Sequence, residues 1–525
     1  MRFRRFRDAY LTIDRRVLGG FRILYGFVLL WDLGWRARFL ELCYSNDGIL
    51  TNHYLLFAPQ AKPQFSIYTA FSTPAEVGAA FAVTAMVYAF YTLGLCTRLM
   101  QILVLVLLTS LNARNLFFED GGVSTLILLA VWTLFLPLGD RFALDRLLAE
   151  ARLGRVSERV RARAARRAPF VSLAVLAIVL QIAVIYWLNA VHKTGPSWRE
   201  GDAVHLVLWQ NRVATSLASF IAYHEPAWFS PLATRGTIVL EALMPVLVLS
   251  PWQSARLRSA AFVLAVLLHG GIALLILLGP FSYAMLCLVF LVLPGSAFDA
   301  IGRRLPARWR RRALGLRARA VRRLSALLVR LGRSPREPIL PARAPVRAWL
   351  AERVLWTREL AVALVMLAAA IQVLRDNRAL PKALKFEQPP PFAAFIGYTR
   401  MLQGWHMFAP DAPRQDGMLV VDATTAGGRR IDPFTGEQPD FELGLRGPVP
   451  HAIIVSDYLF AIQQAHNRAY LLELQGYLAR WHEVERRPAS DRIVRYEIWW
   501  LSHDSPPRGS TEPGPVHKRL VLSGP

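Results

Sequence analysis

Cysteine and charged residues are both scarce in this chain of 525 residues. The sequence has 3 cysteines. Cys96 and Cys287 fall at or within long apolar runs, so no disulfide framework is available to hold an outer domain together. Charged residues make up 19% of the chain and hydrophobic residues 54%. The apolar content exceeds what one soluble core of this length needs, which excludes a soluble enzyme.

Several motifs that mark common protein classes are also missing. We find no Gly-rich phosphate loop and no nucleophile elbow. His269 has no histidine partner three or four residues away, so we predict no metal site. The basic N-terminal stretch lacks a small-residue cleavage site, so the first apolar run is expected to stay as an anchor. The lack of internal repeats disfavours a transporter.

Long apolar runs fill the sequence instead. Because roughly 20 helical residues cross the hydrocarbon core of a bilayer, these runs predict about nine transmembrane helices in a mainly α, polytopic bundle. The run 99–114 is short. The two runs on either side of Gly279 and Pro280 are either two spans or one broken helix. The expected spans are 17–34, 76–96, 99–114, 122–138, 169–191, 235–251, 258–277, 279–295 and 357–375.

The formal charge is +25, and its placement indicates a membrane topology rather than a nucleic-acid partner. Arginine gathers between the apolar runs, near the N-terminus, in 141–167 and in 303–353. The positive-inside rule makes these segments cytoplasmic, and nine spans starting from a cytoplasmic N-terminus satisfy it. Residues 376–525 then lie outside the cytoplasm, and the Arg- and Ala-rich composition suggests a bacterial inner membrane.

The chain divides into a membrane domain (1–295), a basic linker (296–356), a last span (357–375) and an extracytoplasmic α+β domain rich in strands (376–525). Alternation predicts strands near 418–423 and 492–501, with a loop at 505–515. Leucines at helical spacing in the linker leave two interpretations open. An amphipathic helix lies on the cytoplasmic leaflet and binds anionic lipid, or the segment is a solvated linker.

Ionisable residues inside apolar runs are costly, so each is a hypothesis about function. For Arg22, Asp32 and Glu241 we favour a structural role, in which they pair with one another or with carbonyl groups. His192 and Lys193 stand at the outer end of 169–191, where snorkelling to the interface is the ordinary interpretation of a lysine.

Neighbouring residues favour a site around Lys193. Polar and aromatic side chains crowd the same membrane edge, which predicts a polar pocket with aromatic walls. Burial destabilises an ammonium and favours a base near neutral pH. The residues expected in this pocket are Tyr186, Asn189, His192, Lys193, Trp198 and Glu200, with His269 joining from another span.

Five blocks in order resemble the vitamin K-dependent gamma-carboxylase superfamily with its bacterial HTTM (horizontally transferred transmembrane) members. They are GGFRILYGFVLLWD (19–32), LGLCTR (93–98), GDRFALD (139–145), YWLNAVHKTGPSWREG (186–201) and His269 followed by GPFSYAML (279–286). The resemblance covers about residues 10–295. A further block, QGWHMFAP (403–410), is similar to one that follows the last span of HTTM proteins. Its Trp, Met and Phe are expected to pack the outer domain onto the membrane part.

The resemblance implies a chemistry. In the carboxylases the stretch like 186–201 carries a lysine pair, whose second member activates vitamin K hydroquinone. Lys193 holds that position and His192 the first. Oxygen then yields a strong base that removes a glutamate γ-proton before carboxylation. The vertebrate enzymes show Asn-Asn-His where this chain has Asp120-Gly121-Gly122, so a catalytic histidine is missing.

Two functions stay open. The first is an enzyme that deprotonates reduced vitamin K or menaquinol with Lys193 and modifies a secreted peptide or protein, or forms a quinone epoxide. The second is a non-catalytic membrane protein that binds quinone or lipid, or assists assembly, and retains the fold. Fold resemblance alone does not choose between them.

Overall fold

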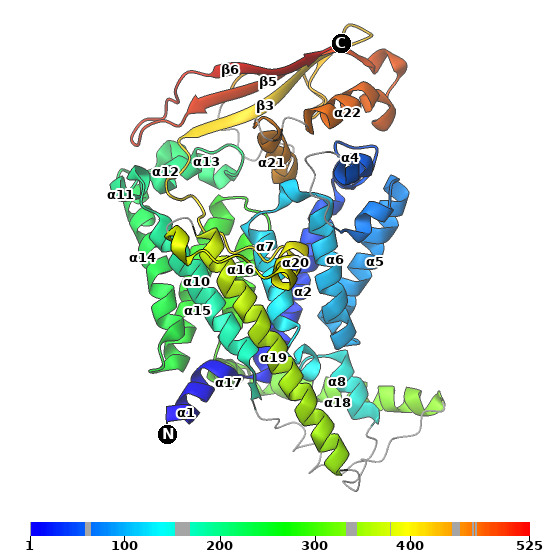
Figure 1. Cartoon of the computed structure of the whole chain (residues 1–525), viewed down its shortest axis with the longest axis vertical. Helices are drawn as coiled ribbons and strands as arrows, with labels where there is room; N and C mark the ends of the chain where they lie inside the picture. The colour runs from blue at the N-terminus through cyan, green and yellow to red at the C-terminus, as the bar shows by residue number, and fades with distance from the viewer. Residues whose placement is uncertain are drawn as a thin grey trace.

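The protein is a bundle of apolar helices with a β-sheet layered over one end (Figure 1). This computed structural model describes residues 2–57, 65–152, 169–331, 344–377, 380–443, 452–464, 467 and 470–525. We call the end that carries the sheet the sheet end. The opposite end, where the N-terminus, α17 and α18 lie, is the basic end.

In the described ranges, 6 helices are long and apolar enough to cross a membrane. They coincide with predicted runs, so the expectation of a multi-span helical membrane protein is confirmed at this level. The helices are α2 (Arg15–Ala37), α5 (Pro74–Leu93), α10 (Leu173–His192), α14 (Phe229–Leu249), α15 (Ser254–Leu275) and α19 (Ala344–Asp376).

The other predicted spans are shorter helices: α6 (Thr97–Arg114), α7 (Gly121–Thr133) and α16 (Phe281–Phe290). A bend of 95° separates α16 from α17 (Gly295–Arg304), and counting that pair as one span gives up to 7. Pro294 stands at the break, where its ring cannot continue a helix. The count of nine spans therefore stays a prediction.

The sequence blocks around Arg22, Gly94 and Asp145 meet at the basic end. The buried Arg22 guanidinium donates to the carbonyls of Leu138, Arg141 and Phe142 at 2.9, 3.2 and 2.5 Å. The Asp145 carboxylate accepts from the backbone of Cys96 and Thr97 at 2.8 and 2.7 Å, which caps the start of α6. These contacts join helix ends that are remote in sequence.

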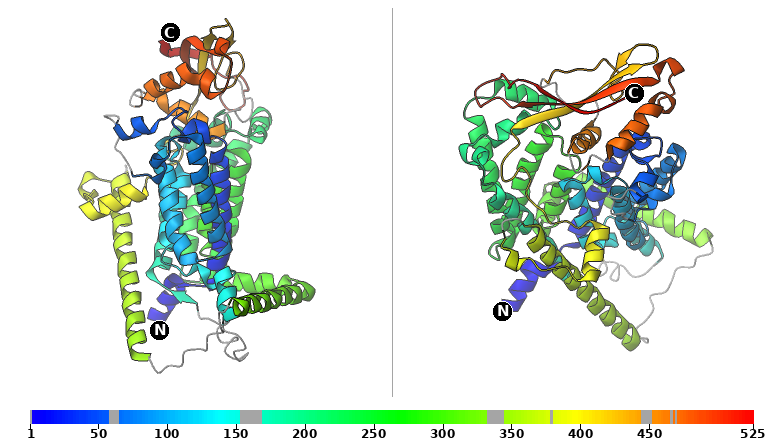
Figure 2. Two further views of the ribbon diagram at one scale, coloured as in Figure 1. Left: turned by 90° about the vertical axis from the view of Figure 1, so that its right-hand side faces the viewer. Right: turned by 45° about the horizontal axis from the view of Figure 1, so that its top comes forward.

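Amphipathic helices extend sideways from the basic end. In Figure 2, α18 (Ala307–Arg330) runs across the direction of the spanning helices. Arg317 on α18 donates to Glu150 on α8 (Leu144–Arg152) at 2.6 Å. Most leucines and all arginines of α18 are exposed, while Leu328 is buried, so the lipid-surface helix and the solvated linker both stay predictions. The four prolines Pro335, Pro338, Pro341 and Pro345 predict an extended stretch before the last span. The first three lie outside the described residues, and the prediction is wrong for Pro345, because this residue falls in the first turn of α19, where a proline is tolerated.

The sheet end carries an antiparallel sheet in the order β4-β3-β5-β6. Its strands are β3 (Gln415–Thr425), β4 (Arg430–Ile431), β5 (Ile493–Asp504) and β6 (His517–Gly524). The predicted strands 418–423 and 492–501 fall in β3 and β5, and residues 505–515 form neither helix nor strand. A small sheet region in this part of the chain is therefore confirmed.

Short helices pack beneath and beside the sheet (Figure 1). On α22 the buried residues Leu474, Tyr477, Leu478 and Trp481 recur at helical spacing. The remaining short helices are α1 (Arg2–Phe6), α3 (Leu40–Tyr44), α4 (Asn52–Phe57), α11 (Pro196–Glu200), α12 (Ala203–Leu208), α13 (Ser216–His224), α20 (Pro390–Thr399), α21 (Ala452–Ile462) and α22 (Leu471–Val484).

Candidate functional site

Lys193 lies just beyond the end of α10 and is buried. Its ammonium nitrogen lies 2.8 and 2.6 Å from the two carboxylate oxygens of Glu241 on α14. The Lys193 and Glu241 side chains are only 3% and 12% exposed. Nζ also stands 4.9 Å from the centre of the Trp198 ring. A lysine held in this way is directed inward and does not snorkel to the interface.

The residues expected to be structural separate into different places. Arg22 satisfies carbonyl groups at the basic end, as one of the sequence interpretations has it. Asp32 accepts from Arg36 at 2.9 Å, one helical turn away. Glu241 pairs with Lys193 rather than with Arg22, because α10 and α14 pack side by side. Glu241 therefore belongs to the candidate site.

Tyr186 and His269 form a second contact within the same part of the bundle. The Tyr186 hydroxyl lies 2.7 Å from Nε2 of His269. Tyr186 precedes Lys193 by two helical turns, so both side chains leave the same face of α10. Among the described residues, no hydrogen-bond partner reaches Nδ1 of His269. This ring nitrogen is an unused polar group inside the bundle.

The block 403–410 folds against the end of α10 and the start of α11. Asn189 accepts from the Met407 backbone amide at 3.0 Å. Trp198 donates its indole N–H to the Phe408 carbonyl at 2.8 Å. His192 contacts the Trp405 carbonyl at 3.2 Å through Nδ1. Two blocks singled out separately in the sequence thus form one wall.

This wall borders a cavity of about 640 Å³ at the sheet end. That volume lies within the range of roughly 300–1,000 Å³ seen for small-molecule sites. Asn189 is the one predicted pocket residue that lines it, while Glu200 is exposed to solvent. The other lining residues are Glu119, Asp120, Gly121, Ser124, Arg375, Asp376, Leu402, Gly404, Trp405, His406 and Met407.

Asp120, which the family resemblance marks only as a departure from its pattern, also lines this cavity. Its carboxylate accepts from the Val123 amide at 2.7 Å and caps α7. Burial raises the pKa of Asp120 to about 7, although the Val123 hydrogen bond opposes this. A carboxyl group with that pKa in a cavity is suited to proton transfer. An Asp directly before Gly-Gly and an apolar run was a recognisable N-cap signal.

Position 122, which stands where the family has its histidine, has no room for a side chain. A Cβ atom there would lie 2.4 Å from the backbone nitrogen of Phe281. Gly122 therefore lets the start of α7 approach the start of α16 closely. A residue larger than glycine at position 122 would force these two helix starts apart.

Asp120 predicts a pH-dependent stability. Its folded pKa of about 7 exceeds the ordinary value of 3.8, so the folded state holds the proton more tightly. The stability that this provides falls as pH rises from about 4 to 7. Asp120→Asn keeps the cap and removes the titration. We expect the variant to gain thermal stability relative to wild type at pH 8 but not at pH 4. Melting curves between pH 4 and pH 8 measure this difference in thermal stability. Equal pH profiles for the two proteins would contradict the prediction.

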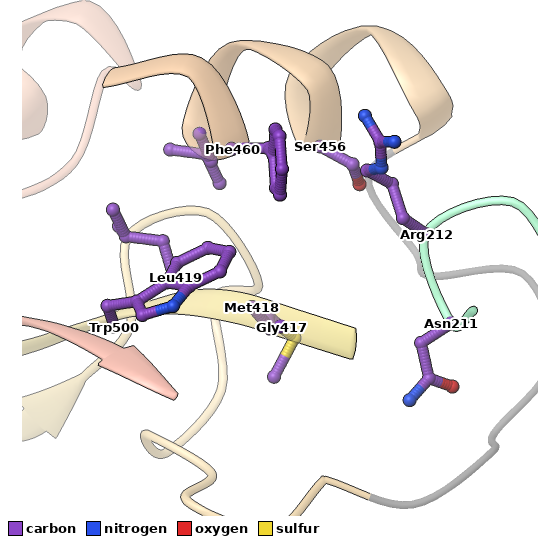
Figure 3. A pocket seen from close by; sticks show the side chains of 9 residues that line it. Asn211, Arg212, Gly417, Met418, Leu419, Ser456, Phe460 and Trp500 are labelled. Carbon is purple, nitrogen blue, oxygen red and sulfur yellow. The ribbon is translucent and has the colours of Figure 1, made fainter. Parts of the chain in front are cut away.

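A second cavity lies between α21 and the sheet and is too small for a cofactor. Figure 3 shows Arg212, Phe460 and Trp500 around it, and its volume is about 30 Å³. That space holds about one water molecule. Arg212 also pairs with Asp457 at 2.6 Å. These residues join the loop after α12 to the sheet-end domain.

No group of three or more His, Cys, Asp or Glu side chains arranged to hold a metal occurs in the part of the chain that the structure describes. The expectation of no metal stays a prediction. Comparison with family models, with curated proteins and with solved structures finds no match. The likeness to gamma-carboxylases therefore rests on the residues quoted above.

Proposed function

We propose that this multi-span membrane protein activates a hydroquinone at its sheet end, with Lys193 as the initiating base. The observation that carries the proposal is the buried Lys193–Glu241 pair against Trp198, next to the wall of the cavity. Burial disfavours both charges of such a pair, and so favours an amine that can accept a proton. In an exposed ion pair the lysine would stay protonated.

The proton transfer requires few parts. The Lys193 amine takes the proton of a hydroquinone hydroxyl and becomes an ammonium, which the Trp198 ring and the Glu241 oxygens stabilise. The hydroquinone is left as its monoanion. The hydroquinone would be reduced vitamin K or menaquinol, and its monoanion would then react with oxygen, as the family resemblance implies. Asp120 then provides a second proton-transfer group on the other side of the wall.

The cavity suits the head group of such a quinone. Trp405 and Met407 offer apolar surface, while Asn189, His406 and Asp120 offer hydrogen-bonding groups. An aromatic ring with hydroxyl groups needs both kinds of partner. A polypeptide substrate would reach this end from water, and the quinone from lipid. The arginines at the opposite end support a cytoplasmic basic end, and hence an extracytoplasmic site in a bacterial inner membrane.

A non-catalytic quinone or lipid binder is the second candidate. Two observations favour it: Lys193 does not line the cavity, and position 122 has no room for a histidine. Such a protein would bind quinone in the same place without turning it over. An assembly role for a secreted product would use the same sheet-end domain.

Aerobic and anaerobic incubation with menaquinol or reduced vitamin K tests both candidates. We expect quinone epoxide, scored by chromatography, to form only with oxygen. Equilibrium binding of the oxidised quinone is measured on the same preparation. Binding without epoxide formation would favour the non-catalytic candidate. The absence of both binding and epoxide formation would contradict both candidates.

A further inference from the structure

A cavity of about 500 Å³ opens at the basic end, away from the candidate site. Residues of α2, of the end of α5, of α8 and of α18 surround it. One side is apolar and the other carries three arginines. The residues that matter to the argument are Phe27, Leu93, Phe142, Arg141, Arg146 and Arg317.

The apolar side consists of exposed side chains on two helices that are long and apolar enough to span a membrane. Phe27 on α2 is 60% exposed, and Leu93 at the end of α5 is 53% exposed. A wall formed by such residues is suited to an acyl chain, because aliphatic carbon is what these side chains face in a bilayer.

Phe142 has a backbone conformation that is unusual for a bulky residue. Its φ is 53°, in the left-handed region that a bulky residue rarely adopts. The buried Arg22 guanidinium holds this turn through the Phe142 and Arg141 carbonyls. The ring is 57% exposed. The hydrogen bonds from Arg22 therefore fix Phe142 beside the cavity.

The basic side concentrates positive charge. One carboxylate oxygen of Glu150 lies 2.9 Å from Nε of Arg146 in an ion pair and accepts a hydrogen bond from Arg317 at 2.6 Å, so it draws two guanidiniums together. Burial lowers the pKa of Arg141, and the nearby Arg146 and Arg317 lower it further. Three guanidinium groups therefore line one side of the cavity, with the Glu150 carboxylate between two of them and Asp14 acting on Arg141.

We propose that this cavity binds an anionic phospholipid, with the phosphate between Arg141, Arg146 and Arg317 and an acyl chain along Phe27 and Leu93. Guanidinium groups bind phosphate oxygens through paired N–H groups. A free phosphate would use only the basic side, whereas a phospholipid uses both. The bound lipid would also join α18 to the spanning helices through its head group.

The test uses the full chain in nanodiscs of phosphatidylcholine with increasing phosphatidylglycerol. We expect phosphatidylglycerol to raise the melting temperature and native mass spectrometry to show one retained copy. The double variant Arg146→Gln/Arg317→Gln should bind phosphatidylglycerol about 25-fold more weakly, since each arginine near the surface contributes roughly fivefold to the affinity. The matched control is Arg312→Gln/Arg323→Gln, which removes two exposed arginines of α18 that do not line the cavity.

Retention of lipid by the control and loss by the cavity variant support the proposal. Equal weakening of both variants would mean general attraction to an anionic surface and would overturn it. An equal rise in melting temperature with inorganic phosphate in pure phosphatidylcholine would also overturn it. Should the double variant not fold, Leu147→Trp keeps all three arginines and fills the cavity instead. Undiminished lipid retention in that variant would count against the site.

Discussion

Protein carrying Lys193→Met is expected to form less than about one hundredth of the quinone epoxide that wild type forms, because a positioned general base contributes roughly 10²–10⁴-fold. Methionine fills similar space but cannot accept the proton. It also leaves the buried Glu241 carboxyl group without its hydrogen-bond partner, so a loss of stability is expected alongside the loss of activity. Chromatography of quinone products and a melting curve measure the two effects separately.

Two further variants separate chemistry from structure at this pair. Lys193→Met/Glu241→Leu replaces the ion pair by apolar side chains, which often restores stability. We expect it to melt near the wild-type temperature and still to lack epoxide formation. Lys382→Met, at an exposed lysine of the sheet end, should leave both unchanged. Recovery of turnover in the double variant would show that Lys193 acts only through packing.

Asp32→Ala is expected to lower the free energy of unfolding by about 3–5 kcal/mol, since it leaves a buried arginine without its carboxylate. The Asp32 and Arg36 side chains are 5% and 4% exposed. Arg36 also donates to the Tyr44 hydroxyl at 2.9 Å, and this neutral acceptor cannot balance the charge. Unfolding in a mild detergent, followed by circular dichroism, measures the change.

The exposed pair between Arg430 and Asp422 provides the control for Asp32→Ala. The Arg430 side chain is 56% exposed, and solvent screening reduces such a pair to about 0–1 kcal/mol. Arg430→Ala should therefore change stability little. If Asp32→Ala were as mild, the buried pair would contribute no more than a surface contact, and its interpretation as a structural element would be wrong.

The membrane helices were predictable from hydropathy, but their number was not. Every apolar run contains a helix, yet α7 and α16 are apolar because neighbouring helices bury them. Lipid and protein both exclude water, so composition alone does not separate the two environments. The bend after α16 occurs at Pro294. A hydropathy average over many residues does not detect a single proline. Of the strands of the sheet end, β3 and β5 were predictable from alternation. In β3 the consecutive residues Leu419, Val420 and Val421 are all buried, so both faces of this strand are covered, and β4 and β6 were not predicted.

The candidate site was predictable in part. The block 186–201 located Lys193 and Trp198, but the partnership with Glu241 depends on how α10 packs against α14, which spacing does not reveal. His192 lies at the wall without lining the cavity. Asp120 escaped notice because its carboxyl group becomes unusual only when burial removes its water.

The contacts made by Met407 and Phe408 have a consequence for biogenesis. A nascent chain that has emerged only as far as Arg375 already contains Lys193, Glu241 and His269. It lacks the backbone groups that hold Asn189 and Trp198 in place, and it lacks one wall of the cavity. Residues 403–410 therefore complete the candidate site only after all of its helices have been synthesised, and a chain that has emerged only as far as Arg375 lacks the finished pocket.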